Sequence, residues 1–161
     1  MIPGVVLHSG RPYARIGSMA HTPINHPLRP LYRALGGLVG IYLIVFGVVG
    51  FIVGDDDRVL GQGANLLWSV VSLILGVIVL IATVVGRNLD VKVDQYIGWG
   101  LVAVGTITLA VSRTDANLLG FTVSTVVVTY ICALILILVS LYGKVGTEED
   151  ARAEEAAAHG A

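Results

Sequence analysis

Residues 34–53 form an uncharged stretch, ALGGLVGIYLIVFGVVGFIV, which restricts the fold more than any other feature of the chain. A helix of about twenty residues rises about 30 Å, which matches the hydrocarbon core of a bilayer. Three further uncharged stretches follow at about residues 65–85, 95–112 and 118–142. Charged residues make up only 13% of the chain, about half the share in a typical soluble domain. We therefore predict an all-α integral membrane bundle of four transmembrane helices, formed by residues 34–143.

The two ends of the chain differ from this bundle in composition. Residues 1–33 hold all five prolines of the protein, together with four arginines. Because each proline removes a backbone donor and restricts the residue before it, we expect an irregular basic arm here. Residues 144–161 are acidic and rich in alanine. Thr147, followed by three acidic residues, suits the start of a helix, so we expect a short helix in this tail.

Lysine and arginine are distributed unevenly between the two sides of the predicted bundle. Eight of the ten lie in the arm, in the loop after residue 85 or in the tail, whereas Arg58 and Arg113 lie on the opposite side. Loops that stay in the cytoplasm carry the excess of these residues. We therefore expect both termini in the cytoplasm and the bundle in the inner (plasma) membrane.

A short sequence recurs within the chain. GANLL at residues 63–67 and DANLL at residues 115–119 each stand at the start of an even-numbered apolar stretch. The matched positions indicate two helical hairpins of the same orientation, produced by an internal duplication. Four shared residues also arise by chance, so both explanations stay open.

Glycines recur at spacings of four and seven residues, which place them on one face of a helix. They are Gly36, Gly40, Gly47, Gly50 and Gly54 in the first stretch, and Gly98 and Gly105 in the third. Small residues on one face let another helix approach closely. The pattern favours internal packing between the first and third helices, and a docking face for another protein is the alternative.

Ionisable side chains are missing from the four apolar stretches. Pumps, proton-coupled transporters and voltage sensors need such groups within the membrane, and a membrane-held haem needs His, Met or Cys ligands. Asn88, Asp90 and Asp94 lie near the expected inner surface without a catalytic partner at a recognisable spacing. Cys132, the only cysteine, reads as a small buried apolar residue. We expect no enzymatic activity, no cofactor and no metal.

Residues 28–143 resemble a known family. The chain has a basic leader (HPLRPLYR), a glycine-rich first stretch, an Asn-led second stretch (NLLWSVVSLILGVIVL) and a second Asn-led hairpin. This order is similar to that of the actinobacterial four-helix membrane proteins grouped as domain of unknown function 4383. The resemblance implies four spans and supplies no activity or catalytic residue.

These observations favour a non-catalytic accessory or assembly subunit of a larger membrane complex. Respiratory-chain assemblies commonly contain small multi-span subunits without redox groups, so a respiratory complex or supercomplex is the host we expect. The partners would be larger membrane subunits and lipid at the cytoplasmic face, where Arg29 and Arg33 suit anionic headgroups. Two alternatives stay open: a small transporter or channel acting as a homo-oligomer, and a lipid- or envelope-sensing protein.

Overall fold

The computed structural model describes residues 25–54, 58–63 and 65–159, so most of the expected basic arm lies outside the described residues. The described residues form helices and no extended strand, apart from one isolated β-bridge between Val59 and Gln62. The helices are α1 (Arg29–Val53), α2 (Leu66–Val85), α3 (Leu89–Val111), α4 (Val123–Tyr142) and α5 (Glu148–His159).

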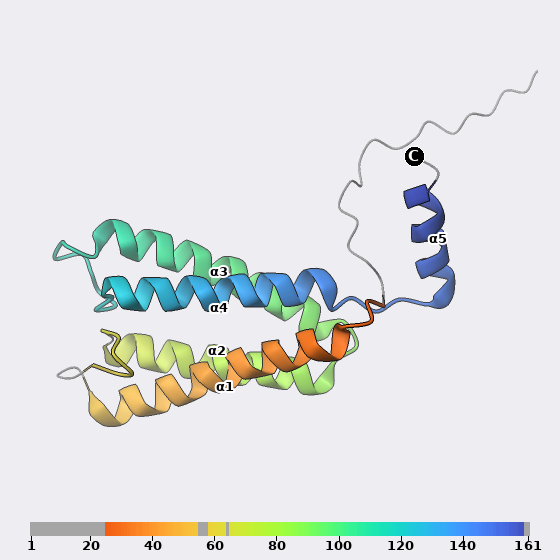
Figure 1. Ribbon diagram of the computed structural model, residues 1–161. Coiled ribbons are helices and arrows are strands. Elements are labelled where there is room, and N and C mark those ends of the chain that lie inside the picture. Colours follow the sequence, from red (N-terminus) through yellow and green to blue (C-terminus); the bar gives the residue numbers. More distant parts are fainter. Residues whose placement is uncertain (1–24, 55–57, 64, 160–161) are drawn as a thin grey trace, which may run out of the picture.

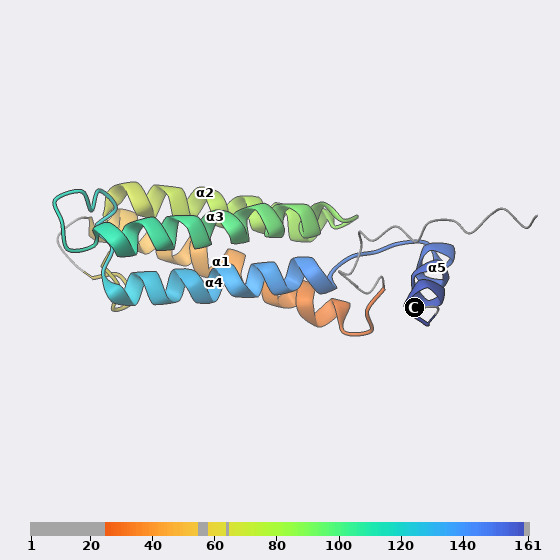
Figure 2. The ribbon, with the colours of Figure 1, turned by 90° about the horizontal axis from the view of Figure 1, so that it is seen from above.

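Four long helices lie side by side, and α5 lies beyond one end of this bundle (Figure 1). α1 packs most extensively on α2, and α3 on α4, while smaller contacts join α1 to α4 and α2 to α3. Figure 2 shows the same bundle from above. We call the end where α1 and α3 begin the arginine end, after Arg29 and Arg33. The opposite end is the tryptophan end, after Trp68.

Three of the helices are long and apolar enough to cross a membrane: α1, α2 and α4. Their outward faces are apolar, with Ile52 77%, Val84 80% and Leu134 63% exposed. Such a surface is costly in water and suits lipid. The fold is therefore all-helical with three candidate membrane spans. α3 differs from these three because its first two turns carry Asp90, Lys92 and Asp94.

Three helix starts differ from the expected boundaries. α1 begins at Arg29 rather than at residue 34, so the last residues of the expected irregular arm are helical. α3 begins at Leu89 rather than near residue 95, so its first turns include charged residues. α4 begins at Val123 rather than near residue 118. Gly120 has a φ of 62°, which ends any continuous helix there, and Thr122 and Thr125 form a reciprocal cap at the start of α4.

The two copies of the repeated sequence have different local structures. Asn65 caps α2, since its side chain accepts a hydrogen bond from the Trp68 backbone N–H at 3.0 Å. Asn117 instead holds the turn before α4, exchanging hydrogen bonds with the backbone of Phe121 at 2.8 and 3.0 Å. The equivalence that a duplication would give is therefore absent at these two asparagines.

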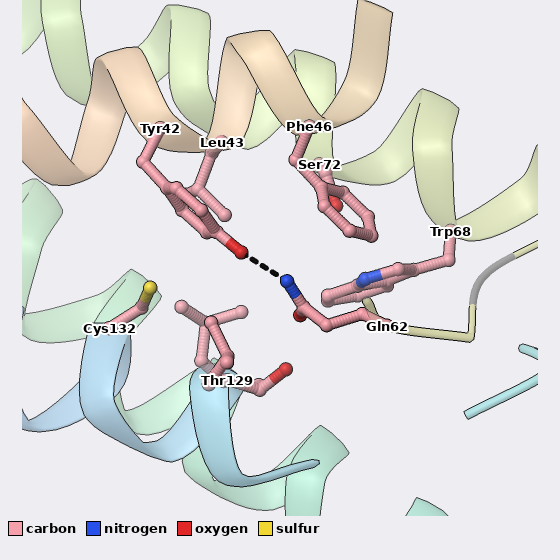
Figure 3. A pocket seen from close by; sticks show the side chains of 10 residues that line it. Tyr42, Leu43, Phe46, Gln62, Trp68, Ser72, Thr129 and Cys132 are labelled. Atoms are coloured by element: carbon pink, nitrogen blue, oxygen red, sulfur yellow. Dashed lines mark hydrogen bonds between the residues drawn. The ribbon is translucent and has the colours of Figure 1, made fainter. Parts of the chain in front are cut away.

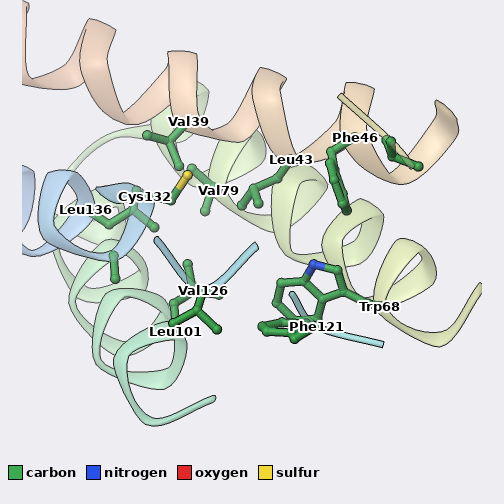
Figure 4. Close-up of a cluster of buried hydrophobic side chains, with 12 residues drawn as sticks. Val39, Leu43, Phe46, Trp68, Val79, Leu101, Phe121, Val126, Cys132 and Leu136 are labelled. Carbon is green, nitrogen blue, oxygen red and sulfur yellow. The ribbon is translucent and has the colours of Figure 1, made fainter. Parts of the chain in front are cut away.

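The core of the bundle is apolar and runs along its length (Figure 4). Leu43 from α1, Val79 from α2, Leu101 from α3 and Leu136 from α4 are all almost fully buried. At the tryptophan end the rings of Trp68 and Phe121 meet edge to face, with centroids 4.7 Å apart. Side chains from all four long helices therefore fill the interior.

The glycines lie at close contacts within the bundle. A Cβ placed on Gly47 would lie 2.6 Å from the Ser69 carbonyl oxygen, so α1 and α2 touch through their backbones there. Gly40 faces Gly76 of α2 in the same way, and Gly98 and Gly105 face α4. Among the described glycines, only Gly36 shows the expected packing of the first helix on the third, through its contact with Asp94. Glycine spacing identified the contact faces, but the main partners are α2 for α1 and α4 for α3.

Candidate functional site

Two aspartates at the arginine end point into the bundle. Asp90 and Asp94 are 2% and 1% exposed. They lie one helical turn apart, and the same buried stripe of α3 continues through Gly98, Leu101, Gly105 and Thr108. Buried carboxylates are rare in proteins unless they are paired. This pair is therefore the most unusual chemical feature of the described residues.

Arg33 of α1 is the counter-charge for one of these aspartates. Its Nε lies 3.4 Å from Oδ2 of Asp90, an ion pair without a formal hydrogen bond. Its Nη2 donates a 2.5 Å hydrogen bond to the carbonyl oxygen of Thr83, near the end of α2. Arg33 thus joins α1, α2 and α3, while its own side chain is one-third exposed.

Asp94 has no counter-charge of its own among the described residues. Both of its carboxyl oxygens, and Oδ1 of Asp90, are buried without a hydrogen-bond partner. A Cβ on Gly36 would lie 3.2 Å from Oδ2 of Asp94 and 3.4 Å from a methyl group of Val139. Asp94 is therefore enclosed by α1 and α4. Two carboxylates face a single guanidinium, which is an excess of acid in a buried place.

Further polar contacts tie both terminal segments to this end. Asn88 donates to and accepts from the backbone of Val145, at 2.7 Å each. The amide of Asn25 makes similar contacts with Gly146, and Arg29 donates through Nε to the Gly143 carbonyl oxygen at 3.1 Å. These bonds cross more than fifty residues of sequence, so they fix the segment after α4 against the starts of α1 and α3.

An open groove lies beside these contacts, between the end of α2 and the segment after α4. Arg29, Arg33 and Arg87 contribute to its lining, together with the exposed side chains of Val84 and Val85. Asp150, in the first turn of α5, also lines the groove. The groove thus combines guanidinium groups with an apolar wall.

α5 carries the acidic tail. Asp150 accepts a hydrogen bond from the Thr147 hydroxyl at 2.7 Å and returns one from its own backbone N–H. The hydrogen bond from the Thr147 side chain is the main reason that the pKa of Asp150 lies below its ordinary value. Glu148 is 87% exposed and pairs with Arg152 one turn later. The sequence gives α5 five acidic residues and one arginine, so α5 is an exposed anionic helix.

A small cavity lies toward the tryptophan end (Figure 3). The Gln62 amide donates a 2.5 Å hydrogen bond to the Tyr42 hydroxyl across it. Ser72 also lines the cavity, and its buried hydroxyl has no protein partner. The volume is about 10 Å³, room for about one water molecule. The cavity is too small for an organic substrate.

Sequence and structure agree unevenly at this site. Arg29 and Arg33 were expected at the inner surface, and the structure brings both to the arginine end, where they bind backbone carbonyls. Sequence reasoning assigned no role to Asp90 and Asp94, and their burial was not predicted. Their spacing of four residues places them on the same face of α3 as Gly98 and Gly105, and this pattern could have indicated the burial. Gly54 lies outside the contact face, because a Cβ there would meet nothing within 4 Å.

No family model matches the chain, and no curated protein or solved structure matches it either. The geometry of the arginine end and the sequence pattern therefore carry the functional inference.

Proposed function

We propose that this chain is a non-catalytic accessory or assembly subunit of a larger membrane protein complex. In this proposal α3 is a fourth span, because it runs alongside the three apolar helices over the same thickness (Figure 1). The arginine end faces the cytoplasm, since Arg29, Arg33, Arg87, Lys92 and Lys144 gather there. Both termini are then cytoplasmic, and the protein lies in the inner (plasma) membrane.

One observation carries this proposal: the acidic helix α5 extends beyond the bundle, while hydrogen bonds from the arginine end hold the segment that leads to it. Arg29 and Asn88 are bonded to the backbone after α4. α5 lies across the direction of the bundle (Figure 1), and the carboxylates of its first turn, Glu148, Glu149 and Asp150, are exposed. The cytoplasmic leaflet is anionic and repels such a helix. A basic surface of a partner subunit is its natural complement.

The interior offers little room for chemistry or transport. Between the two ends, Val39, Leu43, Leu101 and Leu136 fill the centre of the bundle. The glycine faces are used within the chain, so a partner would contact the apolar outer faces and α5 instead. A respiratory-chain complex or supercomplex is the host we propose, and the sequence pattern of residues 28–143 is the basis for proposing kinship with the domain of unknown function 4383 family.

Purification from native membranes in a mild detergent tests the proposal. We expect larger subunits to co-purify in fixed stoichiometry, and haem absorption in that set would identify a respiratory host. Replacing Glu148, Glu149, Glu154 and Glu155 by glutamine should reduce co-purification, whereas Asp115→Asn, an acidic change at the tryptophan end, should not. A chain that purifies alone or as a homo-oligomer would refute the proposal.

A small transporter or channel is the second candidate, and the buried Asp90–Asp94 pair favours it. Ionisable groups within a membrane bundle commonly mark ion or proton paths. The test is ion or proton flux in liposomes that contain only this chain. Flux that disappears in Asp94→Asn would favour the transporter over the accessory subunit.

A further inference from the structure

We propose that the groove at the arginine end binds one anionic phospholipid, with its phosphate at Arg29 and Arg87 and its acyl region against Val84 and Val85. This inference concerns the isolated chain and does not depend on a partner complex. It rests on the charges left unbalanced in the groove, on the apolar wall beside them and on the position of both at one end of the apolar helices.

The guanidinium groups that line the groove differ in how far their charge is balanced. Arg33 forms an ion pair with Asp90, and its Nη2 donates a hydrogen bond to the Thr83 carbonyl oxygen. Arg29 donates to the Gly143 carbonyl oxygen through Nε, and its terminal amino groups have no hydrogen bond with another described residue. Arg87 is exposed and has no hydrogen bond or ion pair with another described residue. Two unbalanced guanidinium groups therefore face one groove, and phosphate oxygens suit their geometry.

The remaining acid of the groove offsets only part of this charge. Asp150, which accepts hydrogen bonds from the Thr147 hydroxyl and backbone N–H, is one carboxylate against the two guanidinium groups of Arg29 and Arg87. Asn88, which also lines the groove, is the N-cap residue of α3, so the positive end of the α3 dipole lies beside it. The balance of charge in the groove is therefore positive.

The apolar wall selects a lipid over a free phosphate ion. Val84 and Val85 are 80% and 51% exposed and belong to the last turn of α2, a candidate membrane span. Tyr32 and Tyr142 stack at the same end, with ring centroids 5.3 Å apart, as aromatic residues do near headgroups. Guanidinium groups directly beyond an exposed apolar turn match a phosphate attached to acyl chains.

Lipid retention by the purified full-length chain tests the proposal. The chain is placed in phosphatidylcholine nanodiscs with a small share of phosphatidylglycerol, and the bound lipid is counted by native mass spectrometry after release into detergent. We expect one retained phosphatidylglycerol. Arg87→Gln should weaken retention about fivefold and Arg29→Gln with Arg87→Gln about 25-fold, from about 1 kcal/mol per basic residue. Arg113→Gln, at the tryptophan end, is the matched control and should change nothing.

Arg87→Gln is the decisive variant, because Arg87 holds no other described residue and its loss leaves the fold intact. Unchanged retention in Arg87→Gln, or an equal loss in Arg113→Gln, overturns the proposal. Val84→Ser separates the two sources of phosphate: it should weaken phosphatidylglycerol retention. Displacement of the lipid by millimolar inorganic phosphate, with no effect of Val84→Ser, would identify a phosphate-ion site and overturn the lipid assignment.

Discussion

Replacing Arg33 by methionine tests whether the buried aspartates depend on a single guanidinium. Methionine keeps an unbranched apolar side chain next to α2 and removes the charge and the donors. Asp90 is then left 3% exposed at its side chain without a counter-charge, and the Thr83 carbonyl oxygen loses its side-chain donor. We expect the bundle to lose free energy of unfolding through both effects.

The magnitude follows from the burial of the two partners. Removing one member of a buried ion pair costs about 3–5 kcal/mol, and the lost hydrogen bond adds about 1 kcal/mol. Because the Arg33 side chain is 33% exposed, water already weakens the pair, and the lower end applies. We therefore expect a total loss of about 4 kcal/mol.

Denaturant titration in detergent micelles, followed by the fluorescence of Trp68 and Trp99, measures this change. A second variant, Arg33→Met with Asp90→Asn, removes the buried charge that the first one leaves unpaired. It should recover at least half of the lost free energy of unfolding. If Arg33→Met costs less than about 1 kcal/mol, or if Asp90→Asn gives no recovery, the ion pair does not hold the helices together as argued.

Three further outcomes are expected. Asp94→Asn should increase the free energy of unfolding by about 1 kcal/mol or more, because it removes a buried carboxylate that has no counter-charge among the described residues. The midpoint of thermal unfolding should rise accordingly, and a lower midpoint would contradict this. Gly47→Ala should cost about 3 kcal/mol in the same assay, since its Cβ meets a backbone oxygen of α2 at 2.6 Å. Gly100→Ala, with nothing within 4 Å, should instead gain about 0.5–1 kcal/mol, and equal effects would refute the contact argument. Because hydrogen bonds from Thr147 lower the pKa of Asp150, its support for α5 should be full above about pH 3.9 and lost as the pH falls through the lowered pKa. NMR signals of α5 should show that loss in the native chain, and Asp150→Asn should give a weaker helix from which this step is missing.

The apolar stretches were predictable because a bilayer-length run without charge has few structural solutions. The start of α3 was not predictable from the sequence. The charged residues at 90, 92 and 94 are typical of a loop, and only the contact of Asp90 with Arg33 of α1 explains why they lie in a helix. That pairing is a tertiary contact which no local pattern records. The start of α4 carried a local signal in Gly120 and Thr122, and the apparent repeat at Asn117 obscured it. For the glycines, the spacing identified the face of the helix that makes close contacts. It did not show which of the three other long helices packs against that face.

The bonds from Asn25 and Asn88 to the segment after α4 have a consequence for the order of biosynthesis. Both asparagines leave the ribosome well before Val145 and Gly146, their backbone partners. Chains fold from the N-terminus as they emerge. These two amides therefore have no backbone partner until α4 and the segment after it have been made. Only then does α5 acquire its fixed position. A wrongly inserted chain would therefore present its acidic tail in no defined place, and under the proposed function a partner that binds α5 would select correctly inserted chains.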